Sequence, residues 1–226
     1  MVSPLSPHRR GFDTSWRANR DANLATSWGD TETDEAFAAV RRNCWDAALQ
    51  SFATSYIFER RARDLGIKLN WITYVGFIVP MIVSLLVLSY GHFDSLPTII
   101  TVASALGVGQ VVVSLWSVVG DWVTRYSYAT DSAAANSGLA RKYEELASSP
   151  PDDISAMRYE CEKLAIRDED RQSRDYQQGV RESEKRMGMR AALRKYQREC
   201  AGCGEVPITM KATSCGVCGN FSYHVR

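Results

Sequence analysis

The chain has 226 residues, of which 45% are hydrophobic and 23% charged, averages that alone suit an ordinary soluble protein. Its 27 basic and 26 acidic residues give a formal net charge of +1, so there is no electrostatic reason to expect nucleic acid binding as the main activity. The apolar residues, however, are concentrated in one central block between the polar segments 1–68 and 124–226. This distribution predicts an all-α membrane protein with two hydrophilic arms.

The N-terminal arm divides into two parts. Residues 1–33 are rich in Ser, Pro, Asp and Thr without apolar periodicity, so we expect them to be mostly disordered. A cytoplasmic helix is expected over 34–68, because Thr33 can cap it and apolar residues repeat on one face. These residues are Phe37, Val40, Cys44, Ala48 and Phe52. Cys44 is therefore interpreted as a small core residue rather than a reactive thiol, and Cys161 likewise.

A transmembrane hairpin is expected over 69–122. The first span, 71–90, has 20 residues without a charge, which matches a hydrocarbon core of about 30 Å at about 1.5 Å per residue. The second uncharged run gives a span over 96–119. Because only Gly91–Ser95 separate them, the two helices must be antiparallel. The length of two adjacent uncharged runs argues against a buried helical pair in a soluble core.

The residues that flank the spans predict the orientation. Basic residues precede the first span and follow the second, whereas Gly91–Ser95 contains no Lys or Arg. The flanking basic residues are Arg60, Arg61, Arg63, Lys68 and Arg125. Both termini are therefore expected in the cytoplasm, with the hairpin in the inner (plasma) membrane.

Small and polar residues share one face of each expected span. In the second span the stripe comprises Ala103, Gly107, Gln110, Ser114, Ser117 and Asp121. In the first it comprises Thr73, Gly76, Pro80 and Ser84, with a kink expected at Pro80. Two interpretations remain open: the stripes pack against each other within one hairpin, or several copies in a homo-oligomer turn them toward a shared pore.

Further cytoplasmic helices are expected over 123–197. The first, 126–147, ends before the proline pair Pro150 and Pro151, and Asp152 and Asp153 favour the start of the next. Apolar residues form one face of each helix: Leu139, Tyr143 and Leu146 in the first, and Ile154, Met157, Cys161 and Leu164 in the second. Nearly every residue of 167–186 is charged or polar, which predicts a solvated helix or a flexible tether.

The C-terminal segment 198–226 carries the strongest chemical signal. Two CxxC pairs, each followed by glycine, are separated by eleven residues; the cysteines are Cys200, Cys203, Cys215 and Cys218. Two such knuckles complete a tetrahedral four-thiolate site, and the intervening residues suffice for a small β-hairpin, so we expect a structural zinc ribbon. His224 is a weaker alternative ligand. Zinc is preferred to iron only on the closed four-thiolate geometry.

The sequence contains no pattern typical of an enzyme. Histidine is limited to His8, His92 and His224, four thiolates leave no open metal position, and no nucleophile motif is present. There is also no Gly-rich phosphate loop, so we identify no direct nucleotide site.

Two resemblances follow from these features. The helix ending Tyr56-Ile-Phe-Glu-Arg-Arg-Ala, the tight hairpin and the segment from Ala140 to Leu146 resemble the SLATT group of bacterial two-transmembrane effector domains. The CxxCx(11)CxxC tail resembles a bacterial family, carried on mobile elements, that is named for this spacing. The SLATT resemblance implies an antiviral defence effector that forms a pore in the inner membrane, with a partner encoded by a neighbouring defence gene. The alternative is a non-lytic membrane adaptor whose zinc ribbon docks a protein or nucleic acid.

Overall fold

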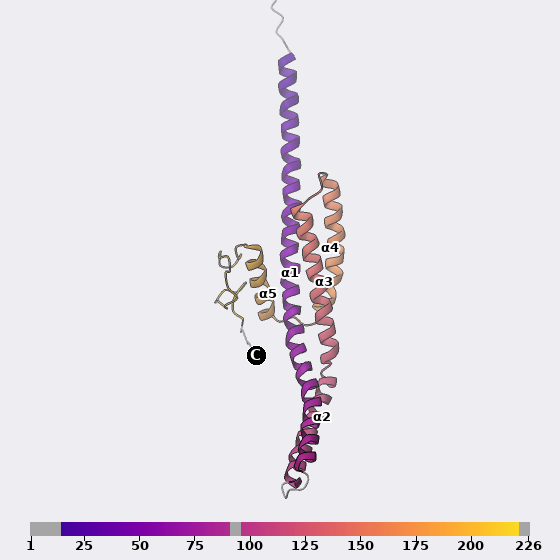
Figure 1. Cartoon of the computed structure of the whole chain (residues 1–226). Helices are drawn as coiled ribbons and strands as arrows, with labels where there is room; N and C mark the ends of the chain where they lie inside the picture. The colour runs from indigo at the N-terminus through magenta and orange to yellow at the C-terminus, as the bar shows by residue number, and fades with distance from the viewer. Residues whose placement is uncertain (1–14, 91–95, 222–226) are drawn as a thin grey trace, which may run out of the picture.

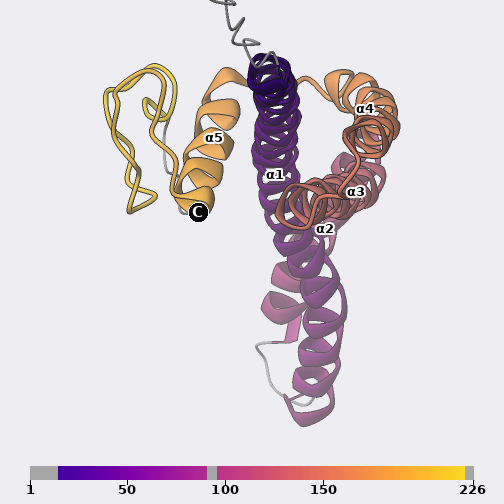
Figure 2. The same cartoon turned by 90° about the horizontal axis from the view of Figure 1, so that it is seen from above.

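The computed structural model describes residues 15–90 and 96–221, and these ranges contain helices and no strand. The helices are α1 (Ser15–Tyr90), α2 (Leu96–Val119), α3 (Trp122–Ser148), α4 (Ile154–Tyr176) and α5 (Glu182–Tyr196). Helix α1 runs the length of the molecule, with α3 and α4 on one side and α5 on the other (Figure 1, Figure 2). The described part of the chain is therefore all-helical, as expected.

Helix α1 is one continuous element of 76 residues. It joins the expected cytoplasmic helix to the first expected span, and it runs through Pro80 without interruption. Residues 15–33, which the sequence predicted to be mostly disordered, form the start of α1 in the structure. This stretch contains Ala, Arg and Leu and no proline, so nothing in its backbone stops the helix from extending toward the N-terminus. Residues 1–14 lie outside the described residues.

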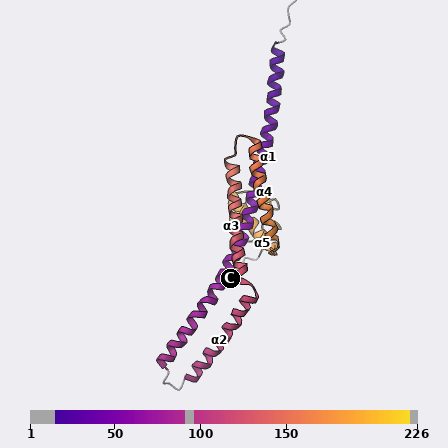
Figure 3. The ribbon, with the colours of Figure 1, turned by 90° about the vertical axis from the view of Figure 1, so that its right-hand side faces the viewer.

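The end of α1 and helix α2 form the hairpin, which projects beyond the other helices (Figure 3). Both helices are long and apolar enough to cross a membrane, and their most apolar windows are only 0% and 6% buried. Large apolar side chains on these helices are exposed: Phe77 by 76%, Leu88 by 84% and Val119 by 85%. A core helix of a soluble protein would be covered, so this surface suits lipid. The expected turn, Gly91–Ser95, lies outside the described residues.

The junction between α2 and α3 corrects one expectation for the second span. Asp121 lies after the end of α2, in a left-handed conformation with φ of 53°, and its carbonyl accepts from the Arg125 amide at 3.0 Å. The chain changes direction there, so Asp121 does not continue the polar face of α2. Sequence periodicity extends a face through such a break because it assumes one uninterrupted helix.

Most residues of the expected apolar faces of the arms meet in one core, whereas Phe52 packs against a second buried cluster. Cys44 and Ala48 from α1 pack with buried residues of α3 and α4: Tyr143, Ala147, Met157 and Leu164. Phe37, Val40, Leu146 and Cys161 surround them. Asp153 caps α4 by accepting hydrogen bonds from the amides of Ser155 and Ala156. The helical periodicities of these arms are confirmed.

The end of α4 differs from the expected solvated segment, because three charged side chains there are buried. Asp168, Arg171 and Asp175 are 8%, 5% and 4% exposed. They face polar residues of α3: Asp175 accepts hydrogen bonds from Tyr128, Ser132 and Asn136, each at 2.7 Å. A charged helix face can be buried only when the neighbouring helix supplies partners, and those partners lie about forty residues away in the sequence.

We expect Asp168→Asn to stabilise the protein at neutral pH. Burial, together with the charge of Asp175, raises the pKa of Asp168, although a hydrogen bond from Gln172 opposes this. Because the folded-state pKa lies above the unfolded value, the native state favours the neutral carboxyl, and stability is lost as pH rises through the raised pKa. The variant should therefore melt at a higher temperature than the wild type at pH 7, and the difference should vanish near pH 4 or below. An equal difference at both pH values would contradict this.

Candidate metal centre

The four cysteines of the tail come together beside the end of α5. Their sulfur atoms all lie within 4.8 Å of one another. The Sγ atoms of Cys200 and Cys215 are 3.9 Å apart, and those of Cys203 and Cys218 are 3.8 Å apart. A tetrahedral ion with metal–sulfur bonds of about 2.3 Å requires sulfurs roughly 3.8 Å apart. The donor set therefore fits a four-thiolate metal ion, and His224 lies outside the described residues.

Each CxxC pair folds as a knuckle whose amides point at sulfur. The amides of Gly202 and Val217 each lie 3.4 Å from the sulfur of the first cysteine of their pair, Cys200 and Cys215 respectively. Backbone amide donors from Cys218 and Val217 lower the pKa of the Cys215 thiol to about 6. Cys215 is thus biased toward the thiolate, which is the form that binds metal.

The β-hairpin expected between the two knuckles is absent from the described residues, so the module is two knuckles joined by irregular chain. After the first knuckle, Gly204 has a positive φ of 71°, whereas after the second knuckle the residue with positive φ is Asn220, at 51°. Gly219 is needed for a different reason: a Cβ atom there would lie 2.5 Å from the Thr213 carbonyl oxygen. The two glycines therefore serve different steric requirements.

The module docks on two helices through the metal-binding cysteines themselves. Cys200 and Cys218 are 2% and 1% exposed, and they pack with Leu49 and Ala53 of α1 and with Ala192 and Leu193 of α5. Cys203 is exposed on the other side. So small a module has little core of its own, and metal binding and docking on α1 together must stabilise it.

Arg190 of α5 is part of the centre and escaped the sequence analysis. It is 6% exposed; its Nε donates to the Thr209 carbonyl at 2.7 Å, and its Nη1 lies 3.3 Å from the Cys218 carbonyl and 3.8 Å from the Cys218 sulfur. A buried guanidinium beside a sulfur offsets the negative charge of a tetrathiolate. The sequence offers one sign that Arg190 is buried: it lies among small and apolar residues, in Met-Gly-Met-Arg-Ala-Ala-Leu.

A further prediction concerns Gly188, where α5 crosses close to α1. A Cβ atom there would lie 2.6 Å from the Ala53 carbonyl oxygen and 2.8 Å from the Ile57 side chain. Gly188→Ala should therefore push α5 away and destabilise its docking by about 1–3 kcal/mol. Faster tryptic cleavage between α4 and α5 would show this.

Gly138→Ala is the matched control for Gly188→Ala. Gly138 is also helical, but a Cβ there meets nothing within 4 Å, so this variant should gain roughly 0.5–1 kcal/mol of stability. Equal cleavage rates for the two variants would contradict the close approach.

The predicted polar stripes are only partly brought together in the hairpin. On α2, Ala103, Gln110 and Ser114 are half-buried, Ser117 is buried, and Gly107 is exposed. On α1, Gly76 is half-buried, and a Cβ there would lie 2.7 Å from Gln110 Nε2. These two residues therefore mark the approach of the helices.

The remaining stripe residues of α1 face outward. Thr73, Pro80 and Ser84 are exposed, and the half-buried positions beside α2 are Ile72, Val79 and Val83. The hydroxyls of Thr73 and Ser84 donate to the carbonyls of Leu69 and Pro80 on their own helix, at 3.0 and 2.8 Å. They therefore need no partner helix in an apolar environment.

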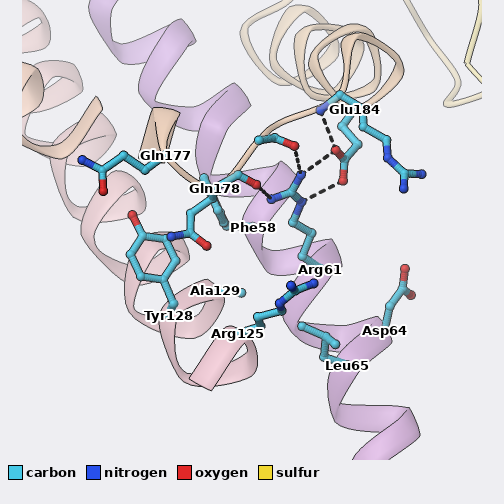
Figure 4. Close-up of a pocket in the computed structure, with 12 residues that line it drawn as sticks. Phe58, Arg61, Asp64, Leu65, Arg125, Tyr128, Ala129, Gln177, Gln178 and Glu184 are labelled. Carbon is cyan, nitrogen blue, oxygen red and sulfur yellow. Dashed lines mark hydrogen bonds and ion pairs between the residues drawn. The ribbon is translucent and has the colours of Figure 1, made fainter. Parts of the chain in front are cut away.

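A polar pocket of about 470 Å³ lies where α1, α3 and the α4–α5 turn meet (Figure 4). Arg61 of α1 reaches across it to Glu184 at 2.7 Å and donates to the carbonyls of Gln178 and Gly179, both at 3.1 Å. One side chain thus ties α1 to the turn that precedes α5, so the helix that bears the metal centre is anchored near the hairpin.

Comparison with known proteins agrees with this site. The chain matches no curated protein and no solved structure. The family described as "Mobilome CxxCx(11)CxxC protein" matches residues 41–221. This range includes α1 from residue 41 onward, helices α2 to α5 and all four cysteines of the metal centre. Because this match covers most of the chain, the protein belongs to the Mobilome CxxCx(11)CxxC family.

Proposed function

We propose that the protein is a membrane-perturbing effector of a bacterial conflict or antiphage defence system, in which several hairpins assemble and open a pathway through the bilayer. The continuity of α1 carries the proposal. This helix presents Leu49 and Ala53 to the metal centre and then continues as a candidate membrane span. A rigid helix can transmit a displacement of the metal module to the hairpin.

The proposed location is the inner membrane, with both arms in the cytoplasm. Two observations support this orientation. Basic residues flank the hairpin, and one of them, Lys68, places its Nζ 5.5 Å from the centre of the ring of Trp122, a residue type favoured at membrane interfaces. A reducing cytoplasm would also keep the four thiols available for metal.

The proposed metal is zinc in a structural role. Four thiolates fill a tetrahedral coordination sphere and leave no position for substrate, so the proposal includes no catalytic step. Iron would occupy the same geometry, and the two metals are separated by the visible absorption that only an iron tetrathiolate shows. Metal content of the purified chain identifies the ion.

The kinship with SLATT effectors belongs to this proposal and is supported by helix order. A long helix enters the hairpin, and further helices pack back on it. Membership in a mobilome family supports a role in genetic conflict. A protein encoded by a neighbouring defence gene is the proposed source of the trigger.

In the proposal, opening of the pathway through the bilayer changes the surroundings of Gln110, which faces Gly76 within the closed hairpin. In an oligomeric pore this amide would turn toward water. Purified protein in liposomes should then release an entrapped dye, and Gln110→Leu should reduce the release. The matched control is Thr101→Val, because Thr101 is exposed on the same helix and satisfies its hydroxyl with the Pro97 carbonyl at 2.8 Å.

Cells provide the decisive test of the effector. Induced expression, alone and together with the neighbouring genes, should dissipate the membrane potential and arrest growth. Unchanged potential and growth in both conditions would reject the proposal, whereas equal dye release by the wild type and Gln110→Leu would reject only the role of Gln110.

The adaptor remains a second candidate because the metal module has apolar side chains on its surface. Ile208 is 78% and Val217 is 41% exposed. Such positions are typical of docking sites. If Ile208→Asp kept the metal but lost binding to a co-expressed neighbouring gene product, while the wild type never permeabilised liposomes, the adaptor would be the better account. Deletion of 198–226 should lose the same partner.

A further inference from the structure

Two cysteines outside the metal centre meet between α1 and α4. The Sγ atoms of Cys44 and Cys161 are 3.1 Å apart, although 117 positions separate these residues in the sequence. Cys44 is completely buried, and Cys161 is half-buried. From the sequence, each was interpreted as an isolated core residue, because helical periodicity does not show which faces meet.

The surroundings of the pair differ from those of a metal site. Its neighbours are core residues, among them Tyr143, Ala147 and Met157. No carboxylate, histidine or further cysteine joins these two sulfurs in a metal-binding group among the described residues. The two thiols also belong to a different apolar cluster from Cys200 and Cys218. The remaining chemistry open to two adjacent thiols is oxidation.

We propose that Cys44 and Cys161 are a redox-sensitive pair, which a peroxide converts into a disulfide that joins α1 to α4. The sulfurs need to approach by only about 1 Å to reach bonding distance, since a disulfide bond is about 2.05 Å long. The inference does not depend on the proposed effector function.

The reaction takes place in two balanced steps. The Cys161 thiolate attacks one oxygen of hydrogen peroxide, the O–O bond breaks, and a sulfenic acid and hydroxide form; with the proton released by the thiol, the hydroxide becomes water. The Cys44 sulfur then attacks the Cys161 sulfur, the S–O bond breaks, and the second water leaves with the Cys44 proton. The two thiols lose two electrons in total, and the peroxide gains them.

The order of attack follows from access and acidity. Cys161 is the half-buried residue of the pair and Cys44 the completely buried one, so peroxide should reach Cys161 first. Burial, together with the neighbouring Cys161, raises the pKa of Cys44 to about 12, which disfavours its thiolate. Cys44 therefore serves as the resolving thiol.

Peptide mapping tests the pair in the full-length, metal-loaded protein. After graded treatment with hydrogen peroxide and alkylation of free thiols, trypsin should release residues 43–60 linked to residues 159–163, and dithiothreitol should separate them. The linkage should form at peroxide doses that leave the metal content unchanged. Unlinked peptides, with both thiols alkylated or Cys161 oxidised to sulfinic acid, would overturn the proposal.

Two variants keep the test independent of folding defects. Cys44→Ala preserves a small apolar side chain in the core, and it should trap a dimedone-reactive sulfenic acid at Cys161. Cys161→Ser should leave Cys44 reduced at the same doses. If Cys44 were oxidised just as readily without Cys161, or if Cys161 formed no sulfenic acid in Cys44→Ala, the assigned order of attack would be wrong.

Discussion

Cys218→Ser should lose the metal ion and unfold the C-terminal module. Cys218 is 1% exposed and pairs with Cys203 at 3.8 Å, so a serine leaves three thiolates and a weak ligand in a buried position. Structural zinc sites contribute about 10–16 kcal/mol of apparent binding free energy, which in so small a module is its folding free energy. Metal content should fall from one equivalent to near zero, and trypsin should cut rapidly at Arg190, which is 6% exposed and bound to carbonyls of the folded module.

Cys161→Ser is the control for this loss, because Cys161 is a partly buried thiol outside the module. It should retain one equivalent of metal and the protection of Arg190. Chelation of the wild type should reproduce the behaviour of Cys218→Ser. A Cys218→Ser protein that kept its metal and its resistance to trypsin would show that the four cysteines do not form one site.

The features that the sequence predicted depend on residues that are close together in the chain. The hairpin follows from two uncharged runs, and the metal centre follows from a local cysteine spacing. The second span was expected over 96–119, and α2 occupies Leu96–Val119. Helical periodicity also found the buried face of α4 around Met157 and Leu164, because an apolar stripe needs no knowledge of its partner.

Three of the features that the sequence missed require knowledge of which helices meet. Arg190 looks like a surface cation until its carbonyl partners in the metal module are known. Cys44 and Cys161 look unrelated until α1 and α4 are placed side by side. The charged end of α4 was expected to be solvated for the same reason, since its partners are on α3. Periodicity identifies a face, whereas the partner of that face depends on tertiary packing.

Substitutions in that charged end of α4 should give the largest loss of stability in the bundle formed by α1, α3 and α4. Asp175→Ala removes the acceptor shared by Tyr128, Ser132 and Asn136. It also removes the buried partner of the Arg171 Nε, 3.4 Å away, and leaves Arg171 paired only with the exposed Asp131 through Nη1 at 2.7 Å. Breaking a buried ion pair by removing one partner costs about 3–5 kcal/mol, and the remaining pair with Asp131 should keep this loss at the lower end. The free energy of unfolding can be measured from the rate at which Cys44, completely buried in the native state, is alkylated in increasing urea.

Asp170→Ala is the matched control, because Asp170 lies on the same helix and pairs with Arg174, but its side chain is 68% exposed. That pair should contribute less than about 1 kcal/mol. Asp175→Asn should cause an intermediate loss of stability, because the new amide oxygen still accepts hydrogen bonds from Tyr128 and Ser132. The new NH₂ group can also donate to Asn136 Oδ1, a buried acceptor without a partner, if the Asn136 amide reverses. Equal losses in Asp175→Ala and Asp170→Ala would mean that water reaches Arg171 in solution and that the network does not hold α3 and α4 together.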